Sequence, residues 1–177
     1  MLDAAELAAL DELQRAVSGE SEVDDVTLHE AVTEQVRRAP DAVAVTAGEH
    51  SMSYRELDRC SDGFAAALAD AGTVLRQPVG VWLDRGPDLL VALLGVLKAG
   101  GVFVPLDPGL PPERARVILA EAGARLCVTA GAEDSAAVCD VARPFAVPAV
   151  DVLRCRATAA PHAPQVDADD LVSIYYT

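Results

Sequence analysis

The sequence contains no asparagine and a single lysine, whereas alanine and arginine are abundant. This bias is typical of GC-rich coding sequence and carries no chemistry by itself. The lone lysine, Lys98, is predicted to lie in the last turn of a helix, where the helix dipole favours a cation. We therefore interpret Lys98 as a structural residue rather than a catalytic one.

Cysteine is also scarce, and no Cys-x-x-Cys pair is present. The four thiols are scattered among apolar neighbours, at Cys60, Cys127, Cys139 and Cys155. A structural zinc site needs ligands at closer and more regular spacing, so this arrangement argues against one. In a cytosolic chain, such cysteines are predicted to be reduced and partly buried.

No long apolar run occurs near the N-terminus. Residues 2–17 form the only apolar stretch there, and Asp3, Glu6, Asp11 and Glu12 interrupt it. We therefore expect neither a signal peptide nor a membrane span, and we predict a cytoplasmic protein. The formal net charge of -14 and the isoelectric point near 4.4 repel polyphosphate backbones, so nucleic acid is not an expected partner.

Several nucleotide-binding and catalytic signatures are missing. Residues 95–100 lack the Gly-Lys-Ser/Thr ending of a Walker loop, and no Gly-x-Gly-x-x-Gly follows a predicted strand. The histidines have no serine or cysteine elbow near them in sequence, and we interpret all three as exposed or locally hydrogen-bonded: His29, His50 and His162. The acidic clusters are interpreted as solvated surface rather than metal ligands: Glu133, Asp134, Asp167, Asp169 and Asp170.

The composition, with 51% hydrophobic and 24% charged residues, is that of a globular chain. A short amphipathic helix is predicted within residues 3–17, and residues 18–25 form a polar, acidic linker. The body begins at Thr27, three residues before Glu30, in a capping-box pattern that starts a helix. We therefore divide the chain into an N-terminal helix and linker, residues 1–26, and a body, residues 27–177.

Strand and helix patterns alternate through the body. Strands are predicted at residues 42–46, 79–83, 102–106, 125–129, 145–150 and 171–176. Helices are predicted at residues 27–38, 53–71, 87–99 and from 112, with a short one before residue 145. The helix from Pro87 is apolar nearly all round and must be buried on several sides. This alternation predicts an α/β fold, a largely parallel sheet with helices on both faces.

Three segments of the body carry a family pattern. Residues 53–57, Ser-Tyr-Arg-Glu-Leu, open a capped helix. Residues 97–108, Leu-Lys-Ala-Gly-Gly-Val-Phe-Val-Pro-Leu-Asp-Pro, end a buried helix on paired glycines and lead through a core strand into a rigid Asp-Pro turn. Residues 171–177, Leu-Val-Ser-Ile-Tyr-Tyr-Thr, form a strand that ends in a Tyr-Thr pair.

In residue type and order, these segments resemble adenylation domains of nonribosomal peptide synthetases, members of the AMP-binding adenylate-forming superfamily. The first two resemble core motifs of that family, and the third resembles the strand that feeds its ATP-phosphate loop. The likeness runs from residue 27 to residue 177, and residues 1–26 resemble the linker that precedes such domains. The resemblance therefore implies the N-terminal subdomain of an adenylate-forming enzyme.

The resemblance also implies an activity. The parent domain activates an amino acid with ATP and Mg²⁺ to an aminoacyl adenylate, then passes it to the phosphopantetheine thiol of a carrier protein. A Gly- and Ser-rich loop ending in Pro-Lys-Gly follows the Tyr-Thr pair in the family, where backbone N–H groups surround the phosphates. Thr177 matches the first position of that loop and is the only residue carried over as a nucleotide contact. No catalytic or metal-binding residue is assigned. The implied partners are the remainder of the adenylation domain, a carrier protein, the amino-acid substrate and a small MbtH-like protein.

Three interpretations stay open from sequence. The first is part of an amino-acid-activating adenylation domain. Because the glycines and the lysine of its phosphate loop are not in the sequence, we expect residues 1–177 alone to lack adenylation activity. A second hypothesis is a noncatalytic split, interrupted or truncated domain that acts as a scaffold or partner-binding module through an open sheet edge. A third is a fragment of an acyl-CoA or aryl-acid ligase. Asp107 favours the amino-acid branch, because acyl ligases often carry Asn at this place.

Overall fold

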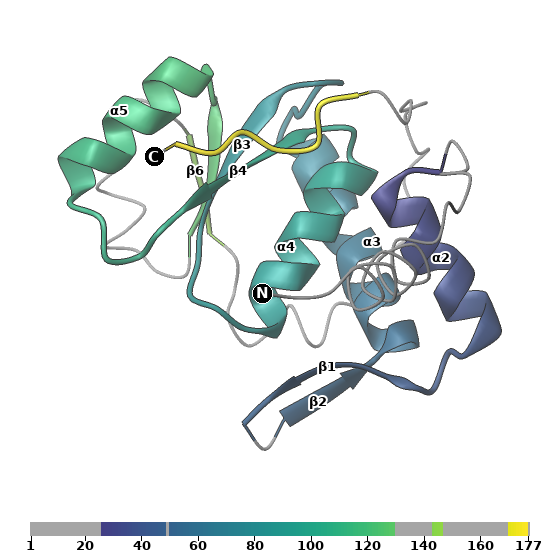
Figure 1. The fold of residues 1–177 in the computed structure, drawn as a ribbon. Helices are drawn as coiled ribbons and strands as arrows, with labels where there is room; N and C mark the ends of the chain where they lie inside the picture. The colour runs from purple at the N-terminus through teal and green to yellow at the C-terminus, as the bar shows by residue number, and fades with distance from the viewer. Residues whose placement is uncertain (1–25, 49, 130–142, 147–169, 177) are drawn as a thin grey trace, which may run out of the picture.

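The computed structural model describes residues 26–48, 50–129, 143–146 and 170–176 (Figure 1). Its helices are α2 (Leu28–Arg38), α3 (Tyr54–Asp70), α4 (Pro87–Lys98) and α5 (Pro112–Ala122). Its strands are β1 (Val43–Ala47), β2 (His50–Ser53), β3 (Pro78–Trp82), β4 (Val102–Leu106), β5 (Leu126–Thr129) and β6 (Arg143–Ala146). The predicted N-terminal helix and linker, and the short helix before residue 143, lie outside the described residues.

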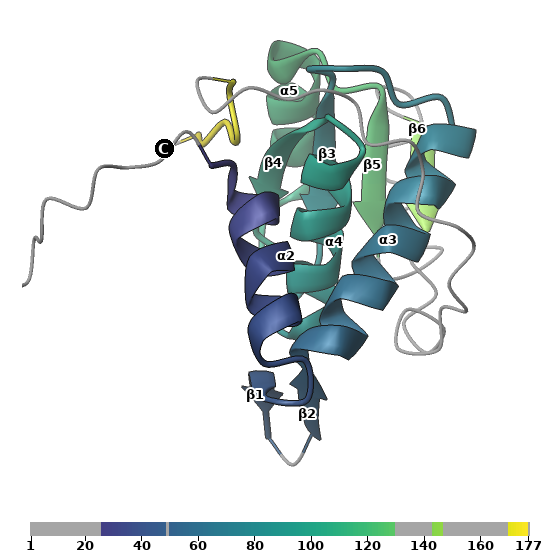
Figure 2. The same ribbon diagram turned by 90° about the vertical axis from the view of Figure 1, so that its right-hand side faces the viewer.

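A four-stranded parallel sheet forms the centre of the described part, in the order β4-β3-β5-β6. Helices α3 and α4 lie on one face of it and α5 on the other (Figures 1 and 2). Alternate side chains of β3 point to opposite faces of the sheet. Val79 and Val81 pack in the core beneath α3 and α4, whereas Trp82 packs in the core beneath α5. The predicted α/β fold, with a parallel sheet between helices, is confirmed.

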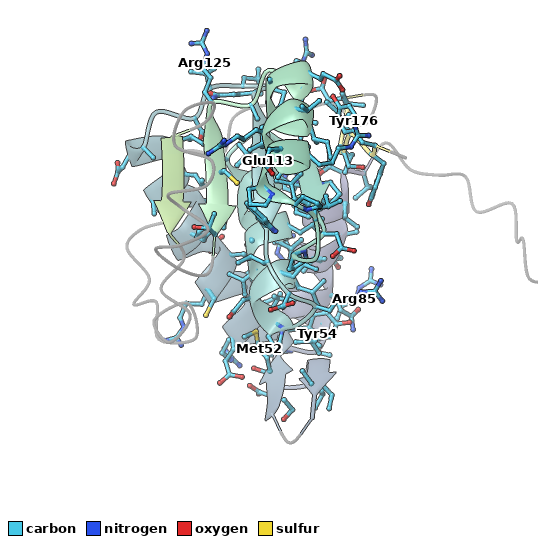
Figure 3. The ribbon with its side chains drawn as sticks, turned by 90° about the vertical axis from the view of Figure 1, so that its left-hand side faces the viewer. Met52, Tyr54, Arg85, Glu113, Arg125 and Tyr176 are labelled. Atoms are coloured by element: carbon cyan, nitrogen blue, oxygen red, sulfur yellow. The ribbon has the colours of Figure 1, made fainter. Side chains whose placement is uncertain are left out.

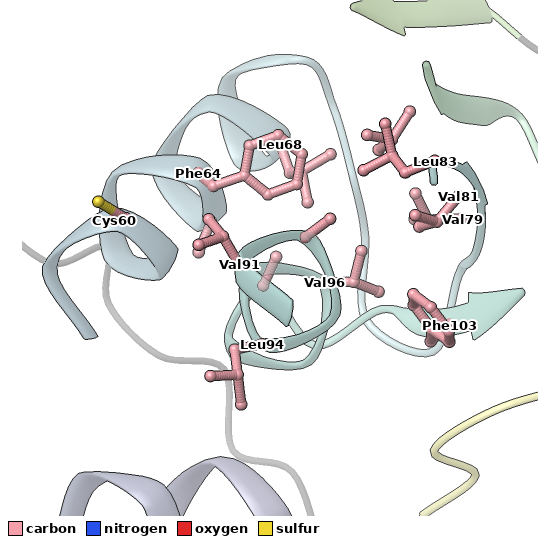
Figure 4. Close-up of a cluster of buried hydrophobic side chains, with 14 of the residues drawn as sticks. Cys60, Phe64, Leu68, Val79, Val81, Leu83, Val91, Leu94, Val96 and Phe103 are labelled. Atoms are coloured by element: carbon pink, nitrogen blue, oxygen red, sulfur yellow. The ribbon is translucent and has the colours of Figure 1, made fainter. Parts of the chain in front are cut away.

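Among the helices that the structure describes, α4 is the most buried, because it packs against the sheet, α3 and α2 at once. Its side chains Val91, Leu94 and Val96 enter the same apolar cluster as Phe64 of α3 (Figure 4). The two helices meet closely at Gly95, where an added Cβ would lie 2.6 Å from Cδ1 of Phe64. The all-round apolar pattern of this helix therefore indicated its central place correctly.

Local signals at the helix ends are also confirmed. Ser53 and Glu56 form a reciprocal capping box, in which the Glu56 N–H donates to Ser53 Oγ at 3.3 Å and the Ser53 N–H donates to Glu56 Oε2 at 2.9 Å. At the C-terminal end of α4, Gly100 has φ +74° and the Gly101 N–H donates to the Val96 carbonyl at 2.9 Å. This is the pattern of a Schellman motif, which explains why the helix stops on paired glycines.

The sequence interpretation missed one strand. β2 pairs antiparallel with β1 in a hairpin of its own, apart from the parallel sheet. Gly48, with φ +60°, lies in the turn between these two strands. Ser53 pairs with Val43 and also caps α3, so the helix-start signal at this residue concealed the end of a strand.

A second prediction was wrong in part. Residues 171–176 do not form a regular strand but make a single parallel bridge, Phe103 to Ser173, on the outer edge of β4. The next edge-facing position of β4 is Pro105, which has no N–H to donate, so the ladder loses one of its hydrogen bonds there. The strand predicted at 145–150 is observed as Arg143–Ala146, two residues earlier at its start, and residues 147–150 lie outside the described part.

Candidate functional site

The carboxyl ends of the parallel strands form the edge where α/β sheets usually bind ligands. After β4, Asp107 turns the chain, and its Oδ1 accepts the Gly109 N–H at 2.7 Å. After β3, Leu83 is buried in the core beneath α3 and α4. Thr129, the last residue of β5, is fully buried. The described part of this edge is therefore held by the turn at Asp107 after β4 and by buried side chains at the ends of β3 and β5.

Residues 170–176 run along β4 and end beside α5 (Figure 1). The Phe103 N–H donates to the Val172 carbonyl at 2.9 Å, and the Ile174 N–H donates to the Phe103 carbonyl at 3.0 Å. Ile174 and Tyr176 pack against the α5 core, and Figure 3 shows Tyr176 next to that helix. Thr177, the one residue predicted to contact a nucleotide, lies outside the described residues, so that assignment stays a prediction.

A phosphate site would need a glycine-rich loop or a helix N-terminus, and a divalent cation would need several carboxylate, His or Cys ligands. Within the described ranges, no group of three or more His, Cys, Asp and Glu side chains is arranged to hold a metal ion. No glycine-rich run follows the carboxyl end of a strand in these ranges either. We therefore assign neither a metal site nor a phosphate-binding loop to the described residues, and we derive no reaction step from them.

Lys98 is held in a polar cluster between α4 and α3. Its Nζ donates to Oδ1 of Asp58 at 2.6 Å, to Oδ1 of Asp62 at 2.7 Å and to the Asp58 carbonyl at 3.2 Å. The Lys98 side chain is only 9% exposed. The ammonium has three acceptors, two of them carboxylates, on a side chain that is nearly fully buried, so the structural interpretation of Lys98 is supported.

The acidic partners of Lys98 were not identified from sequence. Asp58 and Asp62 lie one helical turn apart on α3, beside its buried stripe, and that spacing was the only available signal. The sequence interpretation of a third acidic residue, Asp170, was wrong. Asp170 was interpreted as solvated surface, but its side chain is 12% exposed and its Oδ1 lies 2.7 Å from Nη2 of Arg76. The other acidic residues of those clusters lie outside the described part.

A pocket of about 200 Å³ opens near this ion pair. It lies between the start of α2, the turn after α4 and residues 170–172. His29 lines it, half-buried, with Nε2 at 3.4 Å from Oγ1 of Thr27. Burial lowers the pKa of His29, and the charge of Lys98 lowers it further, while Glu30 acts in the opposite direction. The contact with Thr27 agrees with the local hydrogen bonding predicted for His29.

The remaining expectations concern the cysteines, the other histidines and membrane spans. Cys60 and Cys127 are buried and neither forms a disulfide, as predicted. Cys139, Cys155 and His162 lie outside the described residues, and the side chain of His50 is not described. Among the helices in the described part of the chain, none combines the length and the apolar character needed to cross a bilayer.

Comparison with known proteins assigns a family to this arrangement. A family model described as AMP-binding enzyme matches residues 32–177. The AMB antimetabolite synthetase AmbB of Pseudomonas aeruginosa is 42% identical over 150 residues, which cover 85% of this chain and 12% of AmbB. The chain spans 2–12% of the length of eight curated relatives that it matches.

Solved structures share the fold. The AMPPNP-bound form of the nonribosomal peptide synthetase FmoA3 has a TM-score of 0.74 and 28% identity, and the match covers 88% of this chain and 16% of that one. VinN in complex with L-aspartate has a TM-score of 0.76 and 26% identity, covering 84% of this chain and 43% of that one. The parallel sheet with flanking helices is therefore the arrangement found in these proteins.

Proposed function

This chain belongs to the family of AMP-binding enzymes, and we propose that it forms the N-terminal part of an adenylation domain in nonribosomal peptide synthesis. The proposed reaction activates an amino acid with ATP to an aminoacyl adenylate. The observation that carries the proposal is the placement of residues 170–176. They lie on β4, anchored by Ile174 and Tyr176, and lead directly to Thr177.

The relatives support the choice of reaction class. AmbB is a synthetase, FmoA3 is a nonribosomal peptide synthetase with bound AMPPNP, and VinN has bound L-aspartate. An ATP analogue and an amino acid in two proteins of this fold favour ATP and an amino acid as the ligands here. We therefore prefer this proposal to an acyl-CoA or aryl-acid ligase.

We further propose that Mg²⁺ accompanies ATP, and that a carrier protein with a phosphopantetheine thiol receives the product. When bound, ATP supplies the α-phosphate that the amino-acid carboxylate attacks. The described residues contribute the sheet and helices that fix the start of this site. The hydrogen-bond donors to the phosphates and the metal ligands are proposed to come from the remainder of the domain. The same proposal includes an MbtH-like protein as a partner and a cytoplasmic location.

Amino-acid-dependent exchange of pyrophosphate into ATP tests the proposal. We expect no exchange from residues 1–177 alone, because charge neutralisation at the phosphates needs donors that the described residues do not offer. A domain rebuilt by joining this chain to the remainder of an adenylation domain should exchange pyrophosphate with one or a few amino acids. Exchange by the chain alone would contradict the expected inactivity, and exchange only with aryl or fatty acids would favour the ligase interpretation.

A scaffold or partner-binding role is the second candidate, and one observation favours it. Four exposed apolar side chains surround the 200 Å³ pocket: Val26, Leu28, Leu171 and Val172. Exposed apolar residues grouped around a pocket are typical of a surface that a partner covers. Light scattering of the purified chain, alone and with the remainder of the domain, tests this role. A monodisperse monomer that does not bind the remainder of the domain would count against this role.

A further inference from the structure

The start of the segment along β4 is weakly held by its own contacts. Only two backbone hydrogen bonds join residues 170–176 to Phe103 in the described structure. Leu171 is 58% exposed and Val172 is 41% exposed, so apolar burial does not fix this end. A net contribution of about 1 kcal/mol for each hydrogen bond is small for such a segment. Another interaction must therefore set where the segment begins.

Arg76 and Asp170 supply that interaction. Nη2 of Arg76 lies 2.7 Å from Oδ1 of Asp170, immediately before the exposed pair Leu171 and Val172. The Asp170 side chain is mostly buried, whereas the Arg76 side chain is mostly exposed. Partial burial lowers the effective dielectric around the carboxylate, so this pair is stronger than a fully exposed one.

The backbone of Arg76 is also unusual. Its φ of 61° makes it the one positive-φ residue other than glycine in the described part of the chain. Such a conformation costs about 1 kcal/mol or more for a residue with a side chain. The Arg76 N–H donates to the Gly100 carbonyl at 2.6 Å, which ties this strained turn to the glycine turn before β4. A glycine would fit this backbone without strain, so the arginine side chain needs a separate reason to be there.

We propose that Arg76 and Asp170 form a positioning pair that fixes the register of residues 170–176 on β4. Arg76 connects the turn before β3 and the turn before β4 through its backbone, and connects both to Asp170 through its guanidinium. A slip of one residue along β4 would turn Ile174 and Tyr176 away from the α5 core. By holding Asp170, the pair keeps these partly buried side chains packed on that core and fixes the register of the segment that leads to Thr177 in the sequence.

The consequence for catalysis rests on the proposed function, but the pair itself belongs to this chain. Its direct test is amide hydrogen exchange of the full 177-residue chain, read at the Ile174 and Phe103 amides. Asp170→Asn removes the charge and keeps the backbone. Arg76→Gly removes the guanidinium and relieves the backbone strain. We expect both variants to speed exchange at Ile174 by about threefold or more, with exchange in β3 and β5 unchanged.

Two further variants separate this role from a general loss of charge or stability. Arg55→Ala removes an exposed ion pair of similar length, Arg55 to Asp41 at 3.1 Å, and should leave Ile174 unaffected. The charge swap Arg76→Asp with Asp170→Arg should recover part of the lost protection. Unchanged exchange at Ile174 in both Asp170→Asn and Arg76→Gly, or an equal change in Arg55→Ala, would overturn the proposal.

A second measurement tests the link to the nucleotide. In the rebuilt domain, Asp170→Asn should raise the KM for ATP by about threefold or more, while the KM for the amino acid stays the same. A mere loss of stability would lower the active fraction, and therefore kcat, without this split. An unchanged KM for ATP would overturn the positioning role. If the unaltered rebuilt domain exchanges no pyrophosphate, the proposed function fails, whereas the exchange rate at Ile174 still decides whether the pair fixes the segment.

Discussion

The Nζ atom of Lys98 lies 2.6 Å from Oδ1 of Asp58, so the last residue of α4 is fixed to the face of α3. Asp62 adds a second carboxylate at 2.7 Å on the same face. The three charges sit between two helices that also bury most of the apolar core. This cluster orients α4, and α4 in turn delivers the chain into the glycine turn and β4.

Replacing Lys98 by methionine should destabilise the fold. Lys98→Met keeps the length of the side chain but leaves two partly buried carboxylates without a cation, which costs about 3 kcal/mol. Urea unfolding should show a lower midpoint with an unchanged slope. Arg55→Ala, which removes an exposed ion pair, is the control and should cost less than about 1 kcal/mol. Equal losses in the two variants would contradict a special role for Lys98.

Gly95 should tolerate no side chain. An alanine Cβ there would lie 2.6 Å from Cδ1 of Phe64 and 3.2 Å from the Ser61 carbonyl oxygen. Because α3 and α4 would have to separate, Gly95→Ala should lower the free energy of unfolding by about 1–3 kcal/mol. Gly86→Ala is the matched control, since no atom lies within 4 Å of a Cβ at that position. Thermal unfolding of both variants measures the difference in stability. A Gly95→Ala protein as stable as the control would show that α3 and α4 can move apart at no cost in free energy.

The capping box of α3 should be measurable in the same way. Ser53→Ala removes the oxygen that accepts the Glu56 N–H and the hydroxyl that donates to Glu56 Oε2. We expect a loss of about 1 kcal/mol in the free energy of unfolding. Ser51→Ala, at an exposed position of β2, changes the same atoms without a cap and should have little effect. Similar losses at the two serines would argue that Ser53 acts only as a strand residue.

His29 should make stability depend on pH near neutrality. Because burial lowers its pKa below 6.5 in the folded chain, the unfolded chain binds more protons as the pH falls through 6.5. The free energy of unfolding should therefore decrease between about pH 7.5 and 5.5, and His29→Gln should show a smaller decrease. Urea unfolding of both proteins at the two pH values provides the test, since the other two histidines are present in each.

The glutamates of the two capping boxes, Glu30 and Glu56, affect stability at a lower pH than His29 does. Hydrogen bonds from Thr27 and Ser53 lower the pKa values of Glu30 and Glu56, so their stabilisation is present above 4.5 and is lost as the pH falls further. An equal pH dependence in wild type and His29→Gln between pH 7.5 and 5.5 would mean that His29 is protonated as easily in the folded chain as in the unfolded one.

Local chemistry in the sequence predicted most of the fold. The caps at Thr27 and Ser53 and the glycines after α3 and α4 act within a few residues, so their consequences could be inferred without the fold. The strand β2 was missed because its end coincides with a helix cap. The segment after residue 170 was misjudged because its pairing depends on a proline in another element, which no local pattern reveals.

The candidate site was harder to predict for the same reason. Lys98 was recognised by its place at a helix end, but its partners Asp58 and Asp62 are brought to it only by the packing of α3 on α4. Asp170 looked like surface because its neighbours in sequence are acidic, while Arg76 reaches it from a turn far away in the chain. Charge pairs between distant elements leave no periodic signal in a single sequence.

Pro105 also affects how this protein behaves in solution. A strand at the edge of a sheet can recruit a strand from another molecule, and β4 is such an edge in the described sheet. At Phe103 both edge-facing backbone groups are already bonded within the chain, and at Pro105 there is no N–H for an incoming strand to use. The residue that cuts short the pairing of residues 170–176 therefore also protects this edge against aggregation by strand addition.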